Sequence, residues 1–186
     1  MKSIVMMLVA IISAALVAAP VIEFANEKSR KLSRGAFLDP AEAARQVEIG
    51  PGGLTVHIDR ARQDPEQTWF GVPVLGARGI DWTDRRVSLF VRLSDPAPVR
   101  RDIAIDCPDS DNETFKYKPV SALALADGTL RLDYHFTETG TACKPWGKKA
   151  NGNIDRPLRL GAVMPAYSGP QAAGDITFIR LVVAED

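Results

Sequence analysis

The chain has 186 residues, of which 46% are hydrophobic and 25% are charged, and its formal net charge is zero. This length suits one domain with a sizeable core once a leader is set aside. The balanced charge excludes a general electrostatic attraction to nucleic acid, because domains that bind nucleic acid carry a basic face.

A hydrophobic leader opens the chain. No charged residue occurs over positions 3–22, so residues 1–25 are predicted to be a signal anchor or a signal peptide. The small residues at 17–19 could form a cleavage site, but Pro20 follows them and fits a peptidase site poorly. Residues 13–15 offer a second site. These features favour an uncleaved transmembrane helix, with secretion after cleavage as the alternative.

The signals for membrane orientation disagree. A basic cluster follows the leader: Lys28, Arg30, Lys31 and Arg34. By the positive-inside rule this cluster holds the domain in the cytoplasm. A disulfide between Cys107 and Cys143 would require an oxidising compartment instead. We predict that disulfide, and hence a domain anchored to the cytoplasmic membrane in the periplasm or outside the cell. Two free buried thiols are the alternative.

Residues 26–50 are predicted to be a linker with a short helix at 39–45. Asp39 suits the N-cap of that helix, and Pro40 suits its first position. The glycine-rich residues 50–53 then open a domain over residues 51–186.

The domain shows the period-two alternation of β-strands. Strands are predicted over 54–59, 87–93, 102–106, 158–164 and 175–183. The clearest unit is a hairpin within 122–136, because Asp127-Gly128 is a strong turn signal between two alternating runs. Many short strands with almost no helix predict an all-β fold, an antiparallel β-sandwich.

The last two predicted strands carry a resemblance. Residues 157–163 (PLRLGAV) and 174–183 (GDITFIRLVV) resemble the closing strands of carbohydrate-binding jelly-roll modules of the galactose-binding-like kind. Many such modules have an aspartate in the last strand, where this chain has Ile179 and Arg180. The resemblance implies a jelly-roll-like sandwich and glycan binding, although a shared fold does not fix function.

Four aromatic residues in loop-like stretches are candidate ligand-binding residues: Trp69, Trp82, Trp146 and Tyr167. Exposed aromatic rings beside polar groups can stack on sugars or anchor a protein partner. The alternative is that these rings fill the ends of the sandwich core.

An acidic loop surrounds Cys107. Its alternating oxygen donors, Asp109, Asp111 and Glu113, are the kind of ligands that calcium takes. The EF-hand pattern fails, because Thr114 stands where a glycine is needed. A solvated acidic loop is the alternative, and no other cofactor is expected.

The chain lacks the sequence motifs of common catalytic sites, namely the nucleophile elbow, the zinc-binding helix motif and the phosphate-binding glycine loop. No catalytic residue is therefore assigned. Carboxylate pairs for sugar hydrolysis could be drawn from Asp59, Asp81, Asp133 and Glu138.

The leading hypothesis is a non-catalytic, membrane-anchored envelope protein that binds another envelope component as an accessory subunit of a membrane complex. The alternatives are an exported glycan-binding module and a jelly-roll hydrolase.

Overall fold

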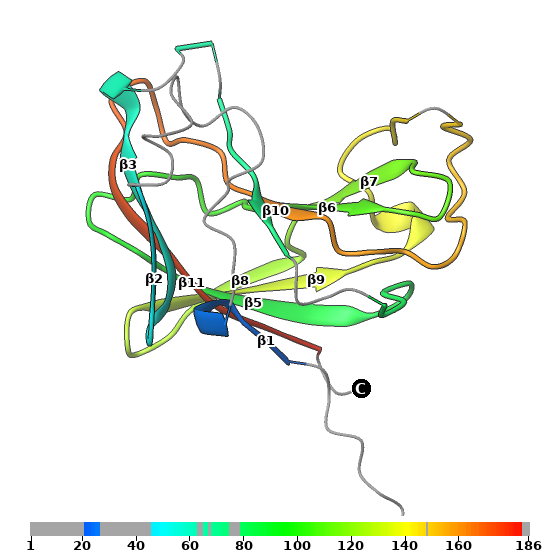
Figure 1. Ribbon diagram of the computed structural model, residues 1–186, viewed down its shortest axis with the longest axis horizontal. Helices are drawn as coiled ribbons and strands as arrows, with labels where there is room; N and C mark the ends of the chain where they lie inside the picture. Colours follow the sequence, from blue (N-terminus) through cyan, green and yellow to red (C-terminus); the bar gives the residue numbers. More distant parts are fainter. Residues whose placement is uncertain are drawn as a thin grey trace, which may run out of the picture.

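The computed structural model describes residues 21–26, 46–62, 65–66, 68–74, 79–147 and 149–183. They form two antiparallel sheets that pack as a β-sandwich, which confirms the predicted all-β class (Figure 1). The strands are β1 (Val21–Glu23), β2 (Val47–Gly50), β3 (Gly53–Asp59), β4 (Val72–Pro73), β5 (Arg86–Leu93), β6 (Ala104–Pro108), β7 (Thr114–Tyr117), β8 (Ser121–Ala124), β9 (Thr129–His135), β10 (Ala162–Met164) and β11 (Ala173–Val183).

The large sheet has the order β2-β3-β11-β5-β9-β8, and β1 pairs with β11 beside it. The small sheet has the order β4-β10-β6-β7. In Figure 1 the small sheet lies above β5, β8 and β9, while β2 and β3 rise along one side. From β3 onward the chain passes repeatedly between the sheets, so their facing sides share one core.

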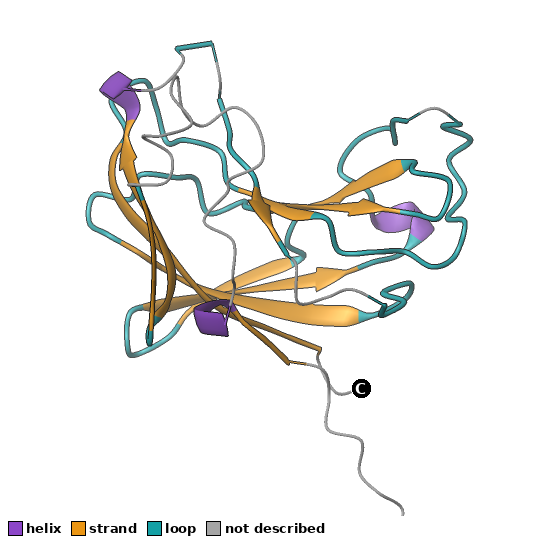
Figure 2. Cartoon of the chain, viewed as in Figure 1, coloured by secondary structure: helices purple, strands orange, loops and turns teal. Residues whose placement is uncertain are grey.

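Helix is scarce in the described part of the chain. Only three short 3-10 turns occur there: Phe24–Asn26, Arg60–Arg62 and Glu138–Gly140 (Figure 2). None of the described helices has the length and apolar character needed to cross a membrane. The predicted hydrophobic helix up to residue 20 and the predicted helix at 39–45 lie outside the described residues.

Residues that the sequence assigns to the end of the leader belong to the large sheet. Val21–Glu23 form β1, which pairs with Arg180–Val182 of β11. Phe24 follows and is fully buried, with its ring centroid 5.6 Å from that of Phe178. Burying a phenylalanine side chain stabilises a fold by roughly 1.5–3 kcal/mol. This contact therefore fixes the segment 21–26 to the domain.

Period-two alternation places the core side chains as expected. In β3, Leu54, Val56 and Ile58 are buried, whereas Thr55 and His57 are only partly buried. The predicted strands at 54–59, 87–93 and 175–183 correspond to β3, β5 and β11. The alternating β-branched and aliphatic side chains explain this agreement, because such side chains suit a half-buried pleated surface.

The predicted hairpin is also confirmed, as β8 and β9. Gly128 adopts a φ of 80°, a left-handed conformation that favours glycine. The Asp127 carboxylate accepts hydrogen bonds from the N–H and the hydroxyl of Thr129, both at 3.0 Å. The glycine conformation and the Asp127 hydrogen bonds are both local to the turn, which explains why the Asp-Gly pair predicted it from the sequence.

Strand β11 lies between β3 and β5 in the large sheet. On one side it pairs with β3 through Ala173–Phe178, and on the other with β5, where the register shifts between Phe178 and Arg180. Gly53 permits the close approach of β3, because it has a φ of 125° and a Cβ there would overlap the Phe178 carbonyl oxygen.

Candidate functional site

A groove crosses the outer face of the small sheet. Ala162 of β10 lies opposite Asp106 of β6, and Asp106 lies opposite Lys116 of β7, which places the three residues in one cross-strand row. Their neighbours Ile105 and Phe115 are fully buried on the inner face. Since successive side chains of a strand point to opposite faces, the row projects away from the core.

Two tryptophans flank this row. Trp69 precedes β4 at one edge of the sheet and makes a β-bridge with Ala166. Trp146 lies beyond β7 at the other edge, where its N–H and C=O bond to the backbone of Thr114 at 3.2 and 2.7 Å. Backbone pairing therefore fixes both ring-bearing segments to the sheet.

The side chain of Lys116 lies between the two rings. Its Nζ is 5.8 Å from the ring centroid of Trp69 and 5.3 Å from that of Trp146, within the range of cation–π attraction. The groove has a volume of about 510 Å³, which falls in the range of small-ligand sites. Its lining is Trp69, Asp106, Lys116, Cys143, Trp146, Ala162 and Met164.

Asp106 is the acidic group of the groove. Burial raises its pKa to about 6, although the nearby ammonium of Lys116 acts in the opposite direction. The two groups are 3.7 Å apart, too far for a hydrogen bond. The groove thus combines two aromatic rings, one cation and one anion.

The structure brings together only two of the four predicted aromatic residues. Trp69 and Trp146 line the groove, and Trp146 is 42% exposed. Trp82 is fully buried in the core, and its backbone N–H donates to the carbonyl oxygen of Leu158 at 2.9 Å. Tyr167 is also buried, beside Phe70, with their ring centroids 5.5 Å apart. These two rings fill the sandwich, as the alternative interpretation holds.

The polar members of the groove were not predicted as ligand-binding residues. Asp106 ends the predicted strand at 102–106, and Lys116 lies in β7, a strand that was not predicted. The alternating run 114–117 (TFKY) carries the signal that could have placed Lys116 on an outer face.

The carboxylates of the acidic loop bind backbone N–H groups of the neighbouring loops. The Asp109 carboxylate accepts the backbone N–H groups of Glu113 and Asp155 at 2.9 and 3.1 Å. The Glu113 carboxylate accepts those of Asn151 and Gly152, both at 3.0 Å. Both carboxylates are buried, so their oxygens compensate desolvation through these bonds.

The third predicted ligand, Asp111, pairs instead with Lys149 at 3.0 Å. Within the described ranges, no group of three His, Cys, Asp or Glu side chains could hold a metal ion. The calcium hypothesis is therefore not supported, because backbone amides and a lysine engage the oxygens that would have been ligands.

The predicted disulfide is absent, since both cysteines are free. Cys107 is fully buried on the inner face of β6, where burial raises its thiol pKa well above the usual value. Cys143 is exposed and lines the groove on the outer face of the same sheet. The sheet separates the two sulfur atoms, so the argument for an oxidising compartment loses its structural basis.

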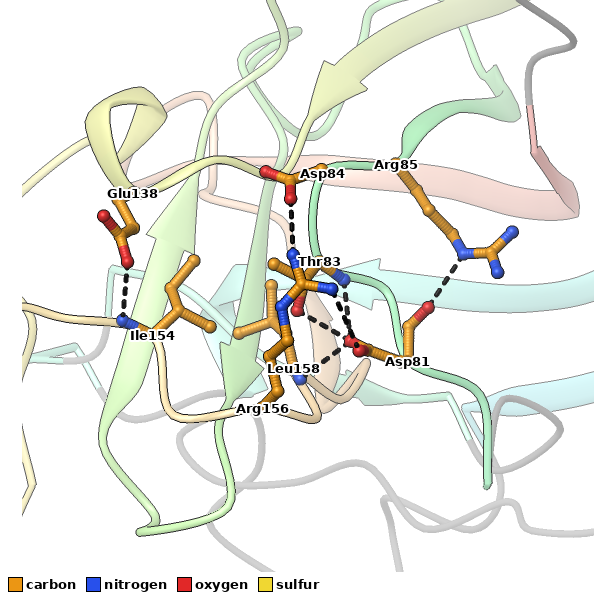
Figure 3. Close-up of polar contacts among 8 residues, drawn as sticks. All are labelled: Asp81, Thr83, Asp84, Arg85, Glu138, Ile154, Arg156 and Leu158. Carbon is orange, nitrogen blue, oxygen red and sulfur yellow. Dashed lines mark hydrogen bonds and ion pairs between the residues drawn. The ribbon is translucent and has the colours of Figure 1, made fainter.

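A second polar cluster surrounds Arg156 (Figure 3). Its guanidinium pairs with Asp84 at 2.7 Å and with Asp81 at 3.7 Å. Burial raises the pKa of Asp81, but hydrogen bonds from Thr83 and Leu158 and the charge of Arg156 outweigh it and lower the pKa. A hollow of about 380 Å³ adjoins this cluster, and the contacts tie the loop at 156–158 to the turn at 81–84.

The four carboxylates considered for sugar hydrolysis have separate partners. Asp81 binds within the cluster just described, and Glu138 accepts the N–H of Ile154 at 3.3 Å. Asp59 pairs with Arg62 at 3.2 Å, and Asp133 binds two serines and an arginine on the large sheet. This arrangement adds no support for a hydrolase.

Comparisons with protein-family models, with curated proteins and with solved structures give no match to this chain.

Proposed function

We propose that the chain is an exported carbohydrate-binding module whose binding surface is the two-tryptophan groove. The single observation that carries this proposal is the position of Trp69 and Trp146, which flank a polar pair in one open groove. A sugar ring has an apolar face that stacks on indole and hydroxyls that bond to charged groups. The predicted leader would supply export.

The strand order supports a jelly-roll connectivity. The seven-stranded large sheet contains the run β3-β11-β5-β9, and the small sheet has the order β4-β10-β6-β7, so each sheet contributes a run of four neighbouring strands. Jelly rolls have eight strands in two such sheets and include lectin domains. The resemblance of the last two strands to carbohydrate-binding modules agrees with this order, and the groove adds a site to it.

Affinity electrophoresis tests the proposal. The protein should be retarded in gels that contain a soluble polysaccharide, tested over glucans, mannans, galactans, alginate and chitosan. Trp146→Ala and Trp69→Ala should each remove most of the retardation. Leu123→Ser is the matched control, because Leu123 is a 51% exposed apolar residue on the other sheet. Unchanged mobility of the wild type in all gels would refute the proposal.

A second candidate function is that of an accessory subunit of a membrane complex, and strand β8 favours it. All four residues of β8 are exposed, and Val120 and Leu123 are 70% and 51% exposed. In the described part of the chain β8 pairs only with β9, so its other edge can accept an extended segment of an envelope protein.

Native mass spectrometry of the full-length protein in mild detergent tests this second candidate. A stoichiometric partner should accompany the wild type and Trp146→Ala but not Leu123→Lys. Travel of the wild type without a partner would reject the candidate, and the measured mass would also show whether the leader is retained.

A further inference from the structure

The floor of the groove presents one acceptor-only group beside one donor-only group. The Asp106 carboxylate accepts hydrogen bonds, and the Lys116 ammonium donates up to three. They occupy opposed positions on β6 and β7, with Nζ and Oδ1 3.7 Å apart. The two groups form an ion pair, but the gap exceeds ordinary hydrogen-bond length, so each keeps hydrogen-bonding capacity for a ligand.

The Asp106 carboxylate has unused capacity. Its Oδ1 atom is shielded from solvent and has no hydrogen-bond partner among the described residues. An unsatisfied buried oxygen costs folding free energy. The whole side chain is 16% exposed and lines the groove, so a ligand hydroxyl can reach the carboxylate at its exposed part rather than at Oδ1.

The Lys116 ammonium is held in place by its ion pair with Asp106 and by the two indole rings. Cation–π contacts with Trp69 and Trp146 fix its position between the rings. These contacts involve the ring faces and leave N–H groups to donate to a ligand oxygen. The donor is therefore positioned before any ligand arrives, which reduces the entropy cost of binding.

The pair carries no net charge, and this decides which ligand fits. A carboxylate on the ligand would attract Lys116 but repel Asp106, and an ammonium would do the reverse. A hydroxyl can both donate and accept. Two adjacent hydroxyls can therefore bridge the pair, one donating to the carboxylate and the other accepting from the ammonium.

We infer that Asp106 and Lys116 make the groove selective for neutral sugars, which they bind through two adjacent ring hydroxyls while a tryptophan stacks on the ring. This inference rests on the proposed carbohydrate-binding function and adds the ligand class and two specificity-determining residues. Removing either charge unbalances the pair, so selectivity should then move toward the sugar of opposite charge to the group that remains.

Calorimetric titration with β-1,4-linked hexasaccharides of glucose, mannose, glucuronate and glucosamine tests this inference. The wild type should bind a neutral hexasaccharide about ten-fold or more tightly than either charged one. Asp106→Asn and Lys116→Met should each weaken neutral binding about ten-fold. Asp106→Asn should gain relative affinity for glucuronate, and Lys116→Met for glucosamine. A purely structural role of these residues would not reverse the charge preference in this way.

Asp102→Asn and Lys118→Met provide the matched controls, because these residues form a more exposed ion pair at 3.1 Å outside the groove lining. Both controls should bind like the wild type, and circular dichroism confirms that every variant is folded. The inference would be overturned if the wild type preferred a charged hexasaccharide, or if the groove variants bound like the controls. Binding that still depends on Trp146 would leave the proposed carbohydrate-binding function standing in either case. No binding by the wild type to any of the four would count against both.

Discussion

Replacing Asp106 by asparagine should stabilise the protein at neutral pH. The carboxylate lies in the groove with a shielded oxygen, and burial raises its pKa from 3.8 to about 6. The folded state therefore holds the Asp106 proton more tightly than the unfolded state does. The cost of its charge is absent below pH about 4 and fully present above pH about 6.

The size of the effect follows from the pKa. Each unit of difference corresponds to about 1.4 kcal/mol, so the full shift is worth at most about 3 kcal/mol. Solvent reaches part of the side chain, and asparagine loses the attraction to Lys116. We therefore expect the free energy of unfolding of Asp106→Asn, relative to wild type, to rise by roughly 1–2 kcal/mol between pH about 4 and about 7.

Urea titrations followed by tryptophan fluorescence at several pH values measure this difference. Asp133→Asn is the matched comparison of opposite sign. Burial raises the pKa of Asp133, but hydrogen bonds from Arg131, Ser121 and Ser88 outweigh it and lower the pKa to about 2. The stabilisation by Asp133 is present above pH about 4 and lost as the pH falls toward about 2. A flat or falling difference for Asp106→Asn would refute the reasoning.

Three further predictions follow from particular residues. Ellman's reagent should titrate only the Cys143 thiol in the native protein, and the Cys107 thiol as well in denaturant. If neither thiol reacted in denaturant, the two cysteines would form the disulfide after all. Gly53→Ala should lower the free energy of unfolding by about 2 kcal/mol or more in urea titrations, because Gly53 has a positive φ and a Cβ there would overlap β11. Gly52 has open space around it, so Gly52→Ala should change the free energy of unfolding by less than about 1 kcal/mol. Glu113→Ala should lower the melting temperature by leaving two backbone N–H groups unpaired, and calcium or a chelator should leave the wild-type melting temperature unchanged.

The sequence was sufficient to predict strands that alternate over six or more residues, such as β3, β5 and β11. It was not sufficient for β1, β2, β4 and β7, which have two to four residues each. Runs this short carry too little alternation to indicate a strand, and β1 and β4 also depend on partners far along the chain, β11 and β10. The apolar run before β1 also hides any alternation there.

The candidate site depends on register, which local pattern does not determine. Asp106 meets Ala162 across β6 and β10, and Trp69 and Trp146 come from opposite edges of the same sheet. Residue types alone predicted the tryptophans as ligands and the acidic loop as a metal site. The structure places two of the four predicted aromatic residues in a groove. The carboxylates of the acidic loop bind backbone amides instead, and these contacts are visible only in three dimensions.

The position of β11 has a consequence for the order of folding. His57 of β3 and Asp175 of β11 form a hydrogen bond across 118 positions of the chain, and folding slows as such separations grow. Before residues 173–183 are in place, β2 and β3 form one fragment and β5, β8 and β9 form another, each with an open edge. Open edges invite aggregation, so the two fragments are protected only when β11 joins them.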